Sequence, residues 1–147
     1  VGRATLYRHF ETREQLIQEI AQESLELTDA VMAPIKAKNL PGKDSIKAML
    51  HALMPLADRY HFLLSLWSIA EGDKVVLTMY NRQLEELYIL IERARAEGDI
   101  NASLSTDWII VTIDSLIYAG WWMVGEEKCT PQQAAEQAIT TLFNGIN

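Results

Sequence analysis

The sequence has a single cysteine, Cys129, among its 147 residues, which excludes an internal disulfide framework and suits a reducing compartment. Strand signals are nearly absent, because no run of alternating apolar and polar residues is bounded by turn residues. A glycine-rich dinucleotide motif, a P-loop, an HExxH motif and a CxxC pair are all missing. We therefore expect neither a sheet-based fold nor an enzyme, and no catalytic residues, metal or cofactor.

Basic charge is also scarce. Thirteen lysines and arginines stand against twenty acidic residues, for a net charge of −7, and an acidic surface repels phosphate, so a general nucleic-acid coat is excluded. The longest apolar stretch, Trp108 to Val124, includes Asp114 and is shorter than the roughly 18 residues that a membrane span needs. No charged-then-apolar leader opens the sequence. We expect a cytoplasmic protein with no membrane partner.

Apolar residues recur at helical spacing along the whole sequence, which predicts an all-α fold of about seven helices. Thr12 with Gln15, and Thr130 with Gln133, have the spacing of capping boxes. Gly98 has the position of a helix-ending glycine. The expected helices cover residues 1–10, 12–34, 44–55, 59–70, 76–97, 107–125 and 131–144, with Pro34 and Pro55 as helix ends.

The most informative motif is the opening VGRATLYRHF, followed by ETREQL. Leu6 and Phe10 lie four residues apart and anchor one face of a short helix, while Arg3 and Arg8 have no acidic neighbour within residues 1–10. This segment resembles the recognition helix and the start of the linker helix in the TetR/AcrR family of transcriptional repressors. The close match covers residues 1–17, and the remainder resembles the family in architecture only.

The resemblance implies DNA contacts by the outward residues of this segment. These are Arg3, Ala4, Thr5, Tyr7, Arg8, His9 and Arg13. Arginine can hold guanine through two hydrogen bonds, whereas contacts to phosphate position the protein without specifying sequence. Tyr7 and His9 match the family's usual backbone-contacting pair, and the family often has lysine at the position of Arg13. On charge alone, the segment is an ordinary solvated helix face.

The family usually carries two further helices before the recognition helix, so we expect an N-terminally truncated member. Residues 1–33 would be a partial DNA-binding head with its linker helix, and residues 34–147 a ligand-binding and dimerisation domain.

The resemblance also implies an inducer among the central helices, where aromatic residues and methionines concentrate. The candidate ligand residues are His51, Phe62, Trp67, Tyr88, Asp114, Tyr118 and Trp122. A buried Asp114 is costly unless paired, so it would meet a cationic ligand, His51 or a backbone N–H, and we favour a structural role for it. Aromatic residues around one acid suit an aromatic or cationic effector.

The helix expected over residues 107–125 is apolar almost all round, and Ala134, Ala135 and Ala138 permit close helix approach. We expect a homodimer through the last two helices. The sequence thus predicts a dimeric repressor that binds a DNA operator and releases it when a small molecule binds. The alternatives are a helical small-molecule binding module or enzyme without a DNA role, marked by a pair of Asp114 and His51, and a structural dimer with a solid core.

Overall fold

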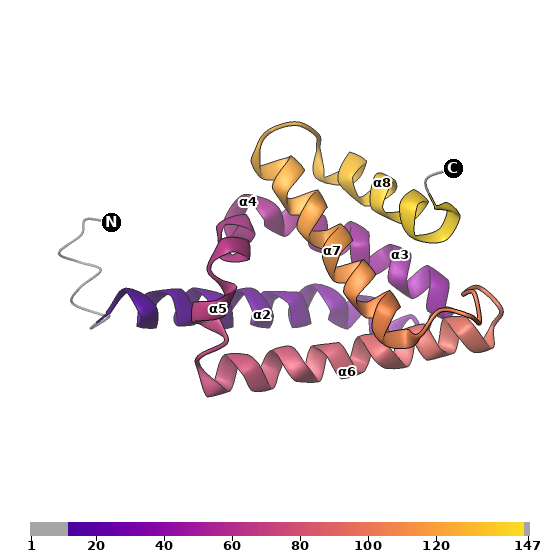
Figure 1. The fold of residues 1–147 in the computed structure, drawn as a ribbon, viewed down its shortest axis with the longest axis horizontal. Coiled ribbons are helices and arrows are strands. Elements are labelled where there is room, and N and C mark those ends of the chain that lie inside the picture. The colour runs from indigo at the N-terminus through magenta and orange to yellow at the C-terminus, as the bar shows by residue number, and fades with distance from the viewer. Residues whose placement is uncertain (1–11, 146–147) are drawn as a thin grey trace.

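The computed structural model describes residues 12–145, and every regular element within that range is helical. The helices, shown in Figure 1, are α2 (Arg13–Ala37), α3 (Gly42–Leu53), α4 (Ala57–Tyr60), α5 (Trp67–Ala70), α6 (Lys74–Ala96), α7 (Thr106–Gly125) and α8 (Pro131–Asn144). Two 3-10 turns, Met54–Leu56 and His61–Ser65, flank α4. The predicted all-α fold is confirmed.

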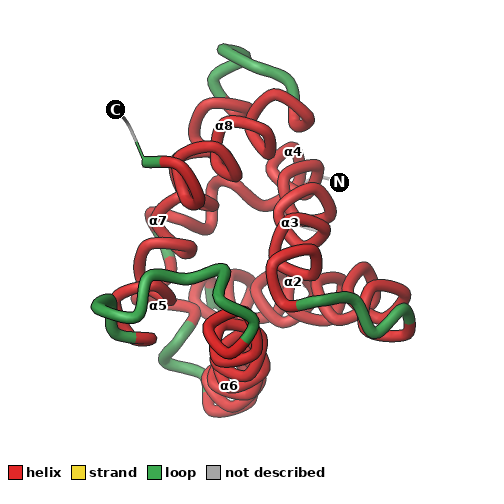
Figure 2. The backbone as a smooth tube through the Cα atoms, turned by 90° about the vertical axis from the view of Figure 1, so that its right-hand side faces the viewer, coloured by secondary structure: helices red, strands yellow, loops and turns green. Residues whose placement is uncertain are grey.

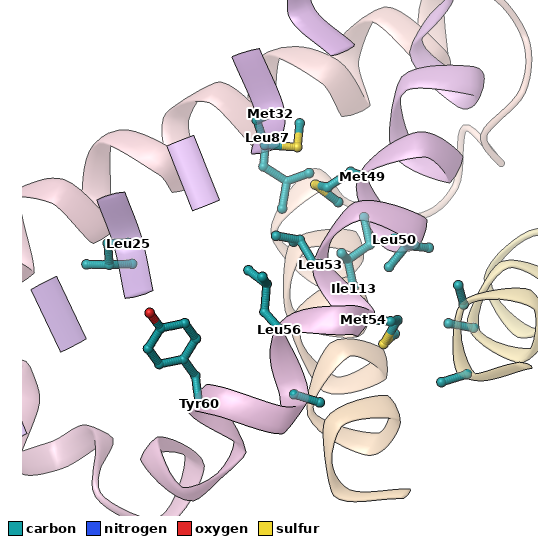
Figure 3. Close-up of a cluster of buried hydrophobic side chains, with 14 of the residues drawn as sticks. Leu25, Met32, Met49, Leu50, Leu53, Met54, Leu56, Tyr60, Leu87 and Ile113 are labelled. Atoms are coloured by element: carbon teal, nitrogen blue, oxygen red, sulfur yellow. The ribbon is translucent and has the colours of Figure 1, made fainter. Parts of the chain in front are cut away.

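Two long helices, α2 and α6, run side by side in the same direction and form one layer of the bundle (Figure 1). Helix α3 returns across them, α7 crosses over both, and α8 lies on the side of the bundle away from α6 (Figure 2). Ile46, Leu50 and Met54 are completely buried, so α3 and the turn after it form the centre of a single hydrophobic core. Figure 3 shows Met32 and Leu87 directed toward Met49 within this core.

The helix starts predicted from capping residues at Thr12 and Thr130 are confirmed. Thr12 accepts a hydrogen bond from the backbone N–H of Gln15 at 3.1 Å, and Ser105 caps α7 in the same way. Thr130 and Gln133 form a reciprocal capping box at the start of α8. Gly98 follows the end of α6 with a φ of 83°, a left-handed conformation that favours glycine.

Two predicted boundaries are wrong because packing overrides the local signal. Helix α2 continues through Pro34 to Ala37, since Pro34 is exposed and removes only one backbone donor near a helix end that packs on α3 and α6. Helix α3 begins at Gly42 rather than after Asp44, because the backbone of Gly42 lies directly against α6.

The single helix predicted over residues 59–70 is also wrong. The chain leaves helical geometry at Tyr60 and again at Leu66, which separates α4, a 3-10 turn and α5. These breaks allow Tyr60, Leu63 and Ala70 all to reach the core. The Tyr60 hydroxyl donates to Glu23 of α2 at 2.9 Å, and burial raises the pKa of Tyr60.

Candidate ligand-binding site

A cavity of about 340 Å³ lies between α2, α3, α6 and α7. It exceeds the roughly 300 Å³ that a small-molecule pocket requires, which counts against the solid-core alternative. We call it the methionine lobe, after Met32 and Met49. Its other apolar lining residues are Leu53, Leu84, Leu87, Ile89, Leu90 and Ile117, and its polar ones are Thr28, Asp29, Lys36, Tyr80, Gln83, Glu86 and Asp114.

A second cavity of about 270 Å³ adjoins the first on the side of α5. We call it the tryptophan lobe, after Trp67 and Trp121. Its remaining lining residues are Ser24, Leu25, Thr28, Leu53, Leu63, Leu64, Tyr80, Gln83, Asp114, Ile117 and Tyr118. Six of these also line the methionine lobe, so the two cavities share a wall.

Asp114 and Tyr80 form a hydrogen bond in that shared wall. The Tyr80 hydroxyl on α6 donates to Oδ2 of Asp114 on α7 at 3.1 Å, and the ring of Tyr80 lies edge-on to Trp67 with 5.1 Å between ring centroids. Burial raises the pKa of Asp114, and the Tyr80 hydrogen bond opposes that shift only in part. Burial and the neighbouring Asp114 raise the pKa of Tyr80. The carboxylate therefore has a neutral donor as its partner, and no cation among residues 12–145 is in hydrogen-bond contact with it.

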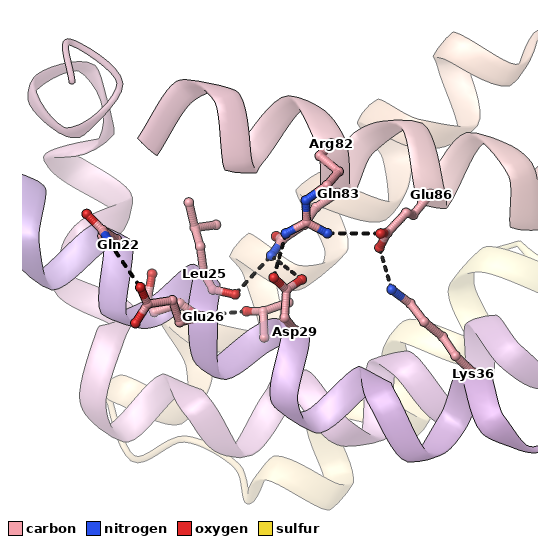
Figure 4. A network of polar contacts seen from close by, with 10 residues as sticks. Gln22, Leu25, Glu26, Asp29, Lys36, Arg82, Gln83 and Glu86 are labelled. Atoms are coloured by element: carbon pink, nitrogen blue, oxygen red, sulfur yellow. Dashed lines mark hydrogen bonds and ion pairs between the residues drawn. The ribbon is translucent and has the colours of Figure 1, made fainter. Parts of the chain in front are cut away.

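A network of side chains ties α2 to α6 at the rim of the methionine lobe (Figure 4). Arg82 bridges Asp29 at 2.5 Å and Glu86 at 2.9 Å, and Lys36 reaches Glu86 at 2.6 Å. Gln83 donates from Nε2 to Asp29 at 3.0 Å and to the backbone oxygen of Leu25 at 2.9 Å. These ion pairs are solvent-exposed and screened, so each adds little stability. Their geometry nevertheless fixes how α2 lies against α6.

The structure brings three of the predicted ligand residues to the cavities. Asp114 lines both lobes, and Trp67 and Tyr118 line the tryptophan lobe. The side chains of His51 and Phe62 are exposed and line neither lobe. His51 is therefore neither a core histidine nor the partner of Asp114.

Two further predicted ligand residues, Trp122 and Tyr88, are also exposed and line neither lobe. Trp122 lies on the outer face of α7. Tyr88 borders a surface groove with Ile89 and Val111 instead.

Sequence reasoning missed Tyr80 and Gln83 as site residues. Neither residue is among the ligand residues predicted from the sequence. They lie three residues apart on one face of α6, a spacing that places both side chains toward α2 and α7. That polar pair on an otherwise apolar helix face was the available signal.

Of the predicted DNA contacts, Arg13 begins α2, where its side chain is exposed. Arg3, Ala4, Thr5, Tyr7, Arg8 and His9 lie outside the described residues, as does the predicted helix over residues 1–10. Between residues 12 and 145, no group of three or more histidine, cysteine or acidic side chains is arranged to hold a metal ion.

Helix α7 is long and apolar enough, by length and composition alone, to cross a membrane, although the sequence had indicated a shorter apolar stretch. Asp114 at its centre is bonded to α6, and the helix packs on α4, α6 and α8. Only the face of α7 toward these helices is buried, and its outer face is exposed.

The raised pKa of Asp114 predicts a pH-dependent stability. Since the native state holds this proton more tightly than the unfolded state, stability falls as pH rises from about 3.9, the unfolded value, through the raised native pKa. Asp114→Asn keeps the shape and an acceptor for Tyr80 without the buried charge. We expect this variant to unfold at a higher temperature than the wild type at neutral pH, with the difference disappearing in acid.

Thermal unfolding followed by circular dichroism between about pH 4 and 7 measures this difference. Asp99→Asn, at an exposed loop position, is the matched control and should follow the wild type. A variant at residue 114 that is less stable at neutral pH would contradict the interpretation.

Comparisons with known proteins rest on structure, since no protein-family model matches the chain and no curated protein matches its sequence. The TetR-like transcriptional regulator LfrR from Mycobacterium smegmatis, solved in complex with proflavine, superposes with a TM-score of 0.77 at 19% identity, covering 100% of this chain and 80% of that one. The MbdR regulator from Azoarcus sp. CIB gives a TM-score of 0.69 at 16% identity, covering 99% and 83%. From α2 to α8, this chain has the fold of the TetR-like transcriptional regulators.

Proposed function

We propose that this protein is a ligand-responsive transcriptional repressor, which binds operator DNA as a homodimer and releases it when a small molecule occupies the helical body. The observation that carries the proposal is that α2 both lines the methionine lobe and adjoins the segment with the predicted DNA contacts. Its residues Thr28, Met32 and Lys36 line the methionine lobe, while its first turn directly follows the segment with the predicted DNA contacts. The regulators with which the chain shares its fold, one of them solved with proflavine, support the same conclusion.

The coupling would act through the separation of α2 and α6. A ligand between these helices favours the arrangement in which its own contacts are best, and it shifts the equilibrium only by its differential affinity. Coupling energies of this kind are typically about 1–3 kcal/mol, which corresponds to a substantial change in operator occupancy. The rim network through Asp29, Arg82 and Glu86 connects the two helices whose separation would change.

The DNA contacts are proposed for Arg3, Ala4, Thr5, Tyr7, Arg8, His9 and Arg13, as the sequence motif implies. Two such segments must reach major grooves one helical turn apart, about 34–36 Å, which requires a two-fold dimer. The exposed apolar residues of α7 support a homodimer through the last two helices. Ala134, Ala135 and Ala138 of α8 do not contribute to this argument, because they are buried within the chain itself. A repressor acts where its DNA is, so we place the protein in the cytoplasm.

We expect the full-length protein, with any residues that precede Val1 in its gene, to select near-palindromic duplexes from a random pool. Fluorescence anisotropy should then give an affinity that falls steeply with salt concentration, because phosphate contacts release counterions. Arg3→Ala should lose roughly 1–3 kcal/mol at one base position. Lys128→Ala, in the exposed turn between α7 and α8, is the control and should leave DNA affinity unchanged. Failure to select any duplex over random DNA would remove the repressor proposal.

The second candidate is a small-molecule binding module without a DNA role, which the two lobes alone would support. The same experiment separates the two functions, because such a module would bind small molecules and select no duplex. An enzyme using Asp114 with His51 is not favoured, since His51 is exposed and Asp114 has Tyr80 as its partner.

A further inference from the structure

The shared wall of the two lobes has an unusual composition. Its six residues come from α2, α3, α6 and α7, and they are Thr28, Leu53, Tyr80, Gln83, Asp114 and Ile117. Four of the six are polar, and Asp114 is the one acid among them. The shared wall thus places one acid and three neutral polar side chains between the two lobes.

The far walls of the two chambers differ in chemistry. Beyond the shared wall, the methionine lobe has three charged residues at its rim, Asp29, Lys36 and Glu86. Its other lining side chains are flexible aliphatic and thioether groups, namely Met32, Met49, Leu84, Leu87, Ile89 and Leu90. The tryptophan lobe is lined beyond the wall by the rings of Trp67, Tyr118 and Trp121 together with three leucines. Aromatic faces favour an aromatic guest, whereas methionine and leucine adapt to an alkyl chain.

The acidic side chains around the shared wall differ in whether they have a cationic partner. Asp29 and Glu86, at the rim of the methionine lobe, are both bonded to Arg82, and Glu86 is also bonded to Lys36. Asp114 has only the neutral hydroxyl of Tyr80 as its hydrogen-bond partner within the described residues. Asp114 is half-buried. A carboxylate partly withdrawn from water without a countercharge is costly, and an ammonium group placed beside it would offset that cost.

We propose that both lobes are filled by one ligand, an amine whose protonated nitrogen lies between an aromatic group and an aliphatic chain. The nitrogen binds at Asp114, the aromatic group enters the tryptophan lobe and the chain enters the methionine lobe. This inference rests on the proposed ligand-binding function of the cavities and specifies the class of effector. It does not depend on DNA binding.

The position of the charge distinguishes this class from its isomers. An amine with a terminal ammonium has to leave one lobe empty when its nitrogen reaches Asp114, or else place its charge in an apolar lobe. A neutral ligand of the same shape fills both lobes but leaves Asp114 without a countercharge. Among ligands of equal size, affinity should therefore depend on where the nitrogen is.

Three probes of matched size test the inference by isothermal titration calorimetry at neutral pH. N-Benzylhexylamine has the central nitrogen, 7-phenylheptylamine is its isomer with a terminal ammonium, and benzyl hexyl ether is the neutral analogue. We expect the central amine to bind roughly tenfold or more tightly than either of the others. Equal affinities for the three probes, or no binding of any of them, would overturn the inference.

Variants that fill one lobe test whether a single ligand spans both. Leu84→Trp fills the methionine lobe, Leu64→Trp fills the tryptophan lobe, and Leu77→Trp, on an exposed face of α6, is the control. Both filling variants should weaken the binding of N-benzylhexylamine, whereas only Leu64→Trp should weaken the binding of benzylamine. Asp114→Asn should abolish the preference for the amine over the ether.

A comparison of truncated probes on the wild-type protein keeps the inference testable if a filling variant does not fold, which circular dichroism would reveal. N-Methylbenzylamine and N-methylhexylamine should each bind more weakly than the parent amine, since each vacates one lobe. If one truncation costs nothing, the ligand uses a single lobe. The inference about the ligand would then fail, while the proposal of a DNA-binding regulator would stand. If instead the protein selects no duplex, the regulator proposal fails and the inference about the ligand stands.

Discussion

Replacing Trp108 and Tyr118 by glutamate is expected to convert a dimer into a folded monomer. The outer face of α7 carries Trp108, Val111, Tyr118 and Trp122, with 64%, 61%, 52% and 49% of each residue exposed. Together with Ser115, they are spaced by three, four, three and four residues, so they form one continuous stripe opposite the buried face. A large exposed apolar stripe of this kind indicates a protein interface.

The two tryptophans of the stripe lie symmetrically about Ser115. One tryptophan lies seven residues before Ser115, the other seven residues after it, and Val111 and Tyr118 lie between. A two-fold interface needs a self-complementary surface, in which a residue of one copy meets its symmetric counterpart on the other. An antiparallel pairing of two α7 helices would bring Trp108 of one copy against Trp122 of the second.

Size-exclusion chromatography with light scattering measures the mass directly. Two glutamates in each copy would bury four charges in an apolar interface, so the dimer should be lost over the whole micromolar range. Val75→Glu is the matched control, because Val75 is an exposed apolar residue of α6 and its replacement should leave the dimer intact. A doubly substituted protein that remains a dimer would place the interface elsewhere.

Replacing Gly42 by alanine is expected to cause the largest loss of stability of any single methyl addition in the described chain. A Cβ at this position would lie 2.5 Å from the backbone nitrogen of Ala94 and 2.8 Å from the backbone oxygen of Leu90. These atoms belong to the α6 backbone and cannot rotate away as a side chain can. The α3 helix would have to move off α6 and lose the hydrogen bond from Gly42 N–H to Glu97 at 3.1 Å.

Overpacking of this kind typically costs about 1–3 kcal/mol, and we expect the upper end of that range because the clash is with backbone. Urea unfolding at neutral pH gives the free energy of unfolding for each variant. Gly72→Ala is the control. Its Cβ would lie 3.2 Å from its nearest neighbour, the backbone oxygen of Ile69, so the substitution should change the free energy of unfolding far less. Identical midpoints for the two variants would show that α3 does not depend on this close approach.

Local signals in the sequence predicted the helices well. Capping residues such as Thr12 and Thr130 act within one turn of their own helix, so their hydrogen bonds follow from sequence spacing alone. The apolar spacing of α6 and α7 likewise depends on the period of one helix. For these elements the type and the approximate ends could be obtained without knowledge of the tertiary structure.

Long-range contacts explain what the sequence did not reveal. Tyr80 and Asp114 are 34 residues apart, and Gln83 bonds Leu25 from 58 residues away, so no spacing rule connects them. The breaks at Tyr60 and Leu66 likewise arise from packing onto other helices. The site was therefore predicted through Asp114 and its aromatic neighbours, whereas the partners that surround the carboxylate required the fold.

The unbroken course of α2 past Pro34 has a mechanical consequence. With 25 residues and a rise of about 1.5 Å per residue, this helix is a rod roughly 37 Å long. If its last turns near Lys36 act as the pivot, a tilt of about 5° displaces the Arg13 end by roughly 3 Å, because a straight helix transmits angle without bending. A slight change in the width of the methionine lobe is thereby amplified at the opposite tip of the rod.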